Sequence, residues 1–349
     1  MPGDPFRVRR SRATVRPMKT SALCITLATL VACKIVDKRH PPPQASESVE
    51  ADTAAAASPQ PQVPPPVAPG SRATKVGTVA GFLTPESALY DSVQDVYFVS
   101  NINGAPLTKD NNGFITRVRP DGPAAIEVLK FVEGGRGGVT LNAPKGMGVI
   151  GDTLWVADID VVRAFNARTG VPIDSVKLDS LGAVFLNDVA IAPNGAVYVT
   201  DTGIRFDDVG NILHPGPDRV FRIGPDRKVS VAVKGDTLGR PNGITLDAVG
   251  RRFIIVQYGG KAVMAWKPGD RAPSVIARGV GGFDGVEMIG GKVVVSSWTD
   301  SSITRFDSTQ GTKIITGVPS PADIGYDAKR NRLLIPILTG NRVEIWQLQ

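Results

Sequence analysis

The 349-residue chain has few of the residues that build soft metal sites or thiol chemistry. It holds two cysteines and two histidines, and past residue 75 it has no cysteine and only His214. A zinc site of the His/Cys type and a cysteine nucleophile are therefore excluded from that part of the chain. Aromatic residues make up only 6% of the sequence, whereas its 38 glycines and 28 prolines favour many short strands joined by turns.

The chain also lacks an excess of one charge sign over most of its length. The formal net charge is +7, but residues 1–75 carry eleven Lys/Arg against five Asp/Glu, and the remainder carries 29 against 28. A nearly neutral folded part gives no support to nucleic-acid binding. The length allows two ordinary domains or one large all-β domain.

The hydrophobic run near the amino terminus is too short to cross a membrane as a helix. Six basic residues precede the stretch 21–32 (SALCITLATLVA), which fits the hydrophobic region of a signal peptide. It ends in Leu-Val-Ala-Cys at 30–33, which resembles the lipobox of bacterial lipoproteins. We expect residues 1–33 to be a signal peptide with Cys33 as the lipidation site. The lipid would be the only membrane contact of a protein in the bacterial cell envelope, facing the periplasm or the cell surface. The alternatives are a secretory signal with an incidental cysteine and a start at Met18.

Residues 34–74 are rich in proline, alanine, glutamine and serine. Such a composition has little to bury, so we expect a semi-rigid spacer without secondary structure. The remaining residues, 75–349, are predicted to form the folded domain.

Short alternating strands fill this domain, separated by glycine, asparagine and aspartate turns, and no segment has a long helical periodicity. One short motif recurs at strand starts. Its aligned residues are Glu86, Lys145, Asn187, Asn242, Asp284 and Asp323, with spacings of 59, 42, 55, 42 and 39. A four-stranded propeller blade takes about 40–45 residues. The sequence therefore predicts an all-β fold, a six-bladed β-propeller with two insertions, in which residues 75–80 add the missing outer strand to the last blade.

The inner strand of each blade begins near the axis, so the aligned residues are expected to face one end of the central channel. Buried charges are costly unless they are paired or bound to a metal. Carboxylate and amide oxygens suit calcium, which takes about six to eight oxygen ligands. We therefore predict Ca²⁺ or another divalent cation at this point. Lys145 would neutralise Asp323 or Asp284, stabilise an oxyanion, or take the place of the metal.

The motifs resemble those of the senescence-marker-protein/gluconolactonase/luciferin-regenerating-enzyme family of six-bladed propellers, from about residue 77 to the end. The resemblance rests on RPNG at 240–243, ND at 187–188, DG at 284–285 and the first-blade glutamate. It implies one divalent metal, usually calcium, held by Glu86, Asn242 and Asp284, with Asn187 as a direct or water-mediated ligand. It also implies a small-molecule substrate and hydrolysis of a lactone or related ester. The alternative is a non-catalytic envelope propeller that binds a ligand or a protein partner around a structural metal.

For the implied hydrolysis, Asp284 is the candidate general base, and Asp323 and Asp188 are the alternatives. Phe185 stands where the sugar-lactone enzymes carry an arginine, which is a departure from aldonolactone specificity.

Two long connections, 101–113 and 202–217, are predicted to form the walls of a substrate pocket. Asn103, Arg205 and His214 are the candidate substrate-contacting residues in these loops. Trp298, like the other three tryptophans, is expected to pack between blades. The sequence makes no prediction of the oligomeric state.

Overall fold

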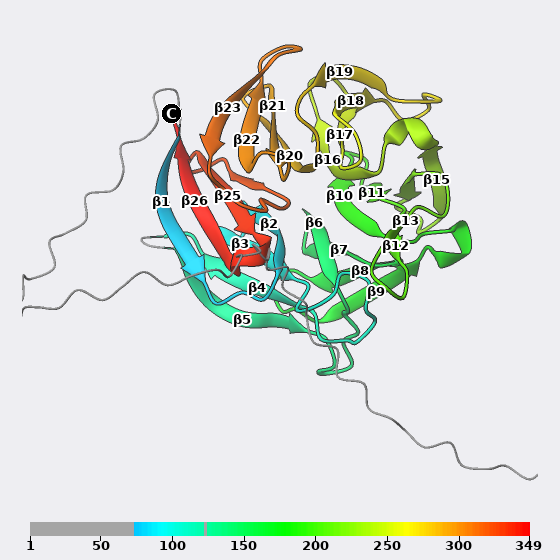
Figure 1. Cartoon of the computed structure of the whole chain (residues 1–349). Helices are drawn as coiled ribbons and strands as arrows, with labels where there is room; N and C mark the ends of the chain where they lie inside the picture. Colours follow the sequence, from blue (N-terminus) through cyan, green and yellow to red (C-terminus); the bar gives the residue numbers. More distant parts are fainter. Residues whose placement is uncertain (1–72, 122–123) are drawn as a thin grey trace, which may run out of the picture. The chain divides into compact units, whose positions relative to one another are not determined.

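The computed structural model describes residues 73–121 and 124–349, which form a six-bladed β-propeller (Figure 1). The predicted all-β architecture is confirmed. The predicted signal peptide, Cys33 and nearly all of the predicted spacer lie outside the described residues. Within the described ranges, no helix has the length and apolar character needed to span a bilayer.

Each blade is a four-stranded antiparallel sheet. Blades one to three consist of β2 (Pro85–Asp91), β3 (Val96–Asn101), β4 (Phe114–Arg119) and β5 (Ala125–Glu133); β6 (Pro144–Ile150), β7 (Thr153–Asp158), β8 (Val161–Asn166) and β9 (Pro172–Lys177); and β10 (Leu186–Ile191), β11 (Val197–Asp201), β14 (Arg219–Ile223) and β15 (Val229–Lys234). Blades four to six consist of β16 (Pro241–Asp247), β17 (Arg252–Gln257), β18 (Ala262–Trp266) and β19 (Ser274–Arg278); β20 (Phe283–Ile289), β21 (Lys292–Ser297), β22 (Ser302–Phe306) and β23 (Gly311–Thr316); and β24 (Gly325–Asp327), β25 (Arg332–Ile337), β26 (Arg342–Leu348) and β1 (Ala73–Ala80).

Smaller elements lie in the connections between these strands. The β-hairpin formed by β12 (Arg205–Phe206) and β13 (Ile212–Leu213) interrupts the connection between β11 and β14. Short 3-10 helices cover Asp179–Leu181, Asp236–Leu238 and Leu338–Gly340.

The last blade is assembled from both ends of the domain. β1 pairs antiparallel with β26, from Ala73 opposite Leu348 to Ala80 opposite Arg342. As predicted, this strand completes the blade and gives β26 a partner on its outer edge. An unpaired edge strand is a template for association with other chains, so closure removes that edge.

Hydrophobic residues gather where one blade faces the next. The described residues contain six large buried clusters, and each is shared by two consecutive blades, including the pair formed by blades six and one. Between blades three and four, for example, Tyr198 packs against Phe253 and Trp266 at centroid distances of 4.5 and 5.8 Å. Such packing fixes the angle between blades and therefore the positions of the inner strands around the channel.

Five of the six inner strands carry a β-bulge at their start. In blade one, Pro85 pairs with Asn101 and Ser87 pairs with Ser100, so the inner strand has one extra residue, Glu86. Equivalent register shifts occur at the start of β6, β10, β16 and β20. A bulge redirects the side chain at the inserted residue. Here it places a polar residue of each of these blades at the same end of the channel.

Candidate metal centre and substrate cavity

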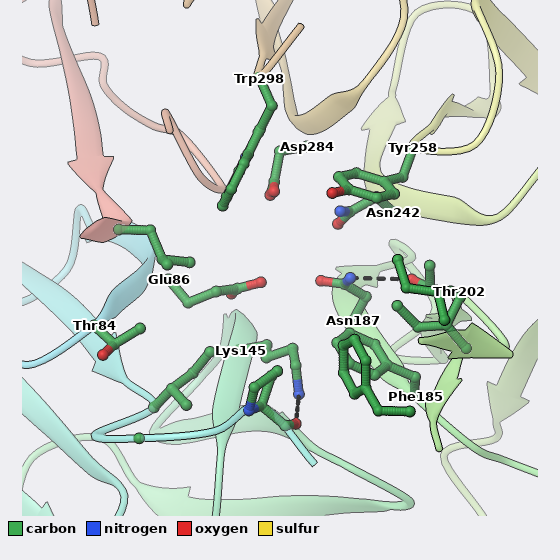
Figure 2. Close-up of a pocket in the computed structure, with 17 residues that line it drawn as sticks. Thr84, Glu86, Lys145, Phe185, Asn187, Thr202, Asn242, Tyr258, Asp284 and Trp298 are labelled. Atoms are coloured by element: carbon green, nitrogen blue, oxygen red, sulfur yellow. Dashed lines mark hydrogen bonds between the residues drawn. The ribbon is translucent and has the colours of Figure 1, made fainter. Parts of the chain in front are cut away.

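Five of the six aligned side chains line one cavity, at the end of the channel where the inner strands begin (Figure 2). They are Glu86, Lys145, Asn187, Asn242 and Asp284, and all five are almost completely buried. The cavity has a volume of about 310 Å³, enough for a small molecule.

Asp323 does not line this cavity, contrary to its predicted place among the other five. Pro321 forms the opening pair of blade six, so Ala322 occupies the position that corresponds to Glu86. Asp323 lies one residue farther along the chain, where Ser87 Oγ donates a hydrogen bond to its Oδ2 at 2.5 Å. Asp323 therefore occupies the position of Ser87, one residue past the cavity-lining position and in the next layer of the channel.

Glycine follows the cavity-lining residue in three blades because neighbouring inner strands approach closely at this level. A Cβ atom at Gly146 would lie 2.4 Å from the Cα of Asp188, and one at Gly285 would lie 2.4 Å from the backbone nitrogen of Ile324. No side chain fits in either place. The "DG" at 284–285 therefore reflects the packing of strands around the axis.

Four buried oxygens in the cavity have no hydrogen-bond partner among the described residues. They are Glu86 Oε2, Asn187 Oδ1, Asn242 Oδ1 and Asp284 Oδ1. Buried polar atoms are nearly always paired, and an unpaired one costs about 1–3 kcal/mol. Figure 2 shows the four side chains pointing from four different blades towards a common space. These oxygens are available to a ligand that accepts hard donors.

The donor set has a particular composition. No group of three or more His, Cys, Asp or Glu side chains is placed to hold a metal ion within 73–121 and 124–349. The cavity instead offers two carboxylates and two amide oxygens. Calcium binds carboxylate and amide oxygens together and completes its shell with water. The residues present therefore fit a single hard divalent cation.

A hydrogen-bond chain fixes the orientation of the Asn187 amide. Asn187 Nδ2 donates to Thr202 Oγ1 at 3.0 Å, and Thr202 Oγ1 donates to the backbone carbonyl of Pro241 at 2.8 Å. A hydroxyl has one proton to donate, so Thr202 must accept from the amide nitrogen. Asn187 Oδ1 is thereby left to face the cavity.

Burial raises the pKa of both cavity carboxyl groups. The pKa of Glu86 lies well above its ordinary value because the group is buried and because Asp284 and Asp323 are nearby, while the charge of Lys145 opposes the rise. The pKa of Asp284 is raised by burial and by Asp323. A bound cation would favour the ionised form of both groups.

Lys145 pairs with neither Asp284 nor Asp323, contrary to one of the predictions. Its Nζ donates to the backbone carbonyls of Pro106 and Ala143, both at 3.2 Å. Figure 2 shows the ammonium group pointing away from the space between the four oxygens. It therefore does not take the place of a metal there, and it connects the first long loop to the base of blade two.

Phe185 forms the other half of the Lys145 environment. Its ring centre lies 4.4 Å from Lys145 Nζ, within the range of a cation–π interaction. Burial lowers the pKa of Lys145, while the charge of Glu86 opposes this shift. Position 185 itself carries no charge, whereas the sugar-lactone enzymes have an arginine there. The amino group beside the Phe185 ring belongs to Lys145 of the neighbouring blade.

The two long connections supply much of the cavity wall, as the blade topology predicts. One joins β3 to β4 and the other joins β11 to β14. The first contributes Ile102, Gly104 and Pro106, and the second contributes Thr202, Ile204, Phe206 and Ile212.

The three predicted loop residues are not among those that line the cavity. Asn103 Nδ2 donates to the carbonyl of Asn112 at 2.9 Å, and Arg205 lines a neighbouring depression. His214 Nε2 lies 2.6 Å from Oδ1 of the buried Asp218. These contacts hold the loops in place, so we assign His214 to the support of the second loop.

Sequence reasoning also missed residues that directly follow the second strand of a blade. Trp298, predicted to pack between blades, lines the cavity instead, and its ring lies edge-on to that of Tyr258 at 6.5 Å. Ile102, Thr202 and Leu338 occupy the same position in their own blades and line the cavity as well. In an antiparallel blade the end of the second strand lies beside the start of the first, so this position is readable from the repeat.

No protein-family model matches the chain, and no curated protein is similar enough in sequence to count as a relative. Solved structures do match. A gluconolactonase from Xanthomonas campestris superposes with a TM-score of 0.57 at 17% identity, covering 77% of this chain and 88% of that one. A structural-genomics target described as a gluconolactonase gives a TM-score of 0.57 at 16% identity, covering 81% and 93%. The chain thus shares the fold of these two proteins.

Proposed function

We propose that this protein hydrolyses lactones or related esters and that the reaction depends on a bound divalent cation. Calcium is the cation that we propose. The observation that carries the proposal is the set of four unpartnered buried oxygens that face one small cavity. The family resemblance of the motifs and the descriptions of the structural neighbours support the reaction class.

Glu86, Asn187, Asn242 and Asp284 are the residues that would hold the cation. When bound, the cation would polarise the substrate carbonyl and stabilise the negative charge on its oxygen. The remaining steps fall to the side chains of the cavity.

Asp284 is the proposed general base. It lines the cavity, and one of its oxygens has no partner among the described residues. It takes a proton from water as the water oxygen bonds to the carbonyl carbon. The ester C–O bond then breaks, and the proton passes to the leaving oxygen, which gives a hydroxy acid from a lactone or an acid and an alcohol from an open-chain ester. Asp323 and Asp188, the alternatives, line the opposite cavity.

Lys145 acts as a positioning residue in this proposal. Its hydrogen bond to Pro106 holds the first loop against the cavity, and its charge keeps the pKa of Glu86 lower than burial alone would. The ionised glutamate is the form that binds a cation.

The first experiment is a cycle of chelation and calcium return on the purified protein. Hydrolysis of a panel of lactones and aryl esters should disappear with chelator and reappear with calcium. Asp284→Ala should abolish it, whereas Asp208→Asn, which removes a carboxylate on the exposed second loop, should not. Calcium binding without turnover of any substrate would instead support a non-catalytic, ligand-binding propeller. Absence of calcium binding would overturn the metal centre.

We further propose that the chain is anchored in the cell envelope through Cys33. The sequence 30–33 supports this, and Cys33 lies outside the described residues. Metabolic labelling with a fatty-acid analogue should mark the wild-type protein and not Cys33→Ser, and unlabelled wild-type protein would contradict the anchor.

A further inference from the structure

The cavity combines a polar base with apolar walls. Beyond the four oxygens and Lys145, the lining is mostly hydrophobic, and the side chains that define its walls are Ile102, Phe185, Ile204, Phe206, Ile212 and Leu338. A site of this kind has few groups with which to recognise a polar substituent.

The polar side chains on the walls are mostly engaged. The hydroxyl of Thr202 bonds to both Asn187 and Pro241, and Lys145 Nζ bonds to two carbonyls. The other polar side chains on the walls are those of Thr84, Tyr258 and Trp298. A polyhydroxylated ring would place several hydroxyl groups against apolar walls without partners, which disfavours binding.

The hairpin of β12 and β13 supplies an apolar surface that is still partly open to solvent. Phe206 and Ile212 are a cross-strand pair, both line the cavity, and their exposed fractions are 41% and 49%. A ligand that covers these side chains gains the hydrophobic free energy of the buried area. The neighbouring Leu213 is 48% exposed but does not line the cavity.

Hydrogen bonds after β13 and at the turn hold the hairpin in one conformation. His214 contacts the buried Asp218 directly after β13, and the turn is closed by Asp207, which accepts hydrogen bonds from the backbone and side chain of Asn211. The positions of Phe206 and Ile212 are thus set before a ligand arrives.

We propose that the substrate carries an apolar substituent, an alkyl chain or an aromatic ring, which packs against Phe206, Ile212 and Phe185 while its ester group faces the four oxygens. This inference rests on the proposed function, because it names the substrate class of the same site. It separates this protein from one that selects a polyhydroxylated sugar lactone.

The test is a series of γ-butyrolactones without a substituent, with a butyl chain and with an octyl chain, beside glucono-δ-lactone. We expect kcat/KM to rise about 2- to 4-fold per buried methylene until the cavity is filled, and to exceed that for gluconolactone. In Ile212→Ser the gain with chain length should shrink at least 5-fold. The matched variant Leu213→Ser should keep it.

A second measurement does not need turnover. The γ-lactams with the same substituents resist hydrolysis, and their binding can be followed by calorimetry, or by tryptophan fluorescence, to which Trp298 in the cavity contributes. Affinity should increase with chain length in the wild type and in Leu213→Ser, but much less in Ile212→Ser. If lactams bind in this way while no ester is hydrolysed, the proposed function fails and the apolar site stands. If gluconolactone is the better substrate, or chain length has no effect, the apolar site is overturned and the hydrolase stands.

Discussion

The two ends of the central channel are built from successive residues of the same inner strands, yet they treat buried carboxylates in opposite ways. At one end Asp284 lines the cavity with an oxygen that has no partner. At the other end, both oxygens of Asp188 accept backbone hydrogen bonds, from Val189 at 2.6 Å and from Ile244 at 2.7 Å. Both groups are buried, and burial raises the pKa of both.

The difference lies in what completes each carboxylate. The bond from Ile244 joins blade three to blade four, so the folded chain itself satisfies Asp188. Asp284 and its three companion residues are left for something outside the chain. Residue type and burial therefore do not separate a structural carboxylate from a ligand-binding one, whereas the inventory of hydrogen bonds does.

The largest effect is expected from Asp284→Ala. It should lower kcat/KM on any substrate that the wild type hydrolyses by about 1,000-fold or more, because it removes a ligand and the base together. Without calcium, the variant should keep most of the wild-type stability, since the change removes a buried carboxylate that lies near Asp323. Steady-state kinetics and urea unfolding check the two halves. Retained activity would refute the role of Asp284.

Asp188→Ala should show the reverse pattern. The change leaves two buried N–H groups without an acceptor and removes a link between two blades, so we expect a loss of about 2–4 kcal/mol in the free energy of unfolding. Calcium affinity of the folded protein should change little. Urea titrations with Asp208→Ala as the exposed control measure the loss. A variant as stable as the wild type would show that the two ends do not differ as described.

Calcium and pH should act on stability in opposite directions. Burial raises the pKa of Asp323 to about 7. A folded-state pKa above the unfolded value stabilises the protein below about pH 4, and this contribution is lost as the pH rises through about 7. Metal-free protein should therefore melt at a lower temperature at pH 8 than at pH 5. Calcium should restore about 2.7 kcal/mol at pH 8 when it is present at 100 times its Kd.

The calcium effect should fade at pH 5, because protons compete for Glu86 and Asp284, whose pKa values burial also raises. The stabilisation by calcium is measured from melting curves at both pH values. Magnesium serves as the comparison ion. Calcium stabilisation that is equal at both pH values would contradict binding through these carboxylates.

Lys145→Met is expected to have the smallest effect. Methionine keeps contact with Phe185 but loses the hydrogen bonds to Pro106 and Ala143, so KM should rise about 2- to 5-fold with a smaller change in kcat. Loss of the charge should raise the pKa of Glu86 further and shift the acid limb of calcium binding to higher pH. Lys145→Arg should recover part of the charge effect. Calcium titrations across pH test whether the charge of Lys145 acts on Glu86. If Lys145 has only a structural role, the acid limb of calcium binding should stay at the same pH in the variant.

Much of the fold and part of the site could be predicted from the repeat. The spacing of the six motifs defines the blades, and the residue after each motif's opening position lies near the axis, as for Glu86 and Asn242. Asp158 and Asp201, at the ends of β7 and β11, accept backbone hydrogen bonds from the adjoining turns. Asp158 accepts backbone hydrogen bonds from Asn142 and Ala143, and Asp201 accepts them from residues 184, 185 and 203.

The position of Asp323 was also readable, because Pro321 aligns with the prolines that open blades one, two and four, and Ala322 then matches Glu86. Other features depend on geometry that spacing does not encode. The direction of Lys145 depends on an aromatic ring from the next blade and a carbonyl from a distant loop. Which loop side chains face the cavity is decided by the turn of a short hairpin, so Ile212 lines it and His214 does not.

The closure of the last blade by β1 limits where a shortened version of the domain can begin. A polypeptide that started at the first motif, Pro85, would leave β26 without its outer neighbour and would expose a row of unsatisfied backbone groups. A second copy could donate its own strand to that row, which is the route to swapped dimers and to longer polymers. The eight residues of β1 therefore cover the outer edge of β26 as well as complete the fold.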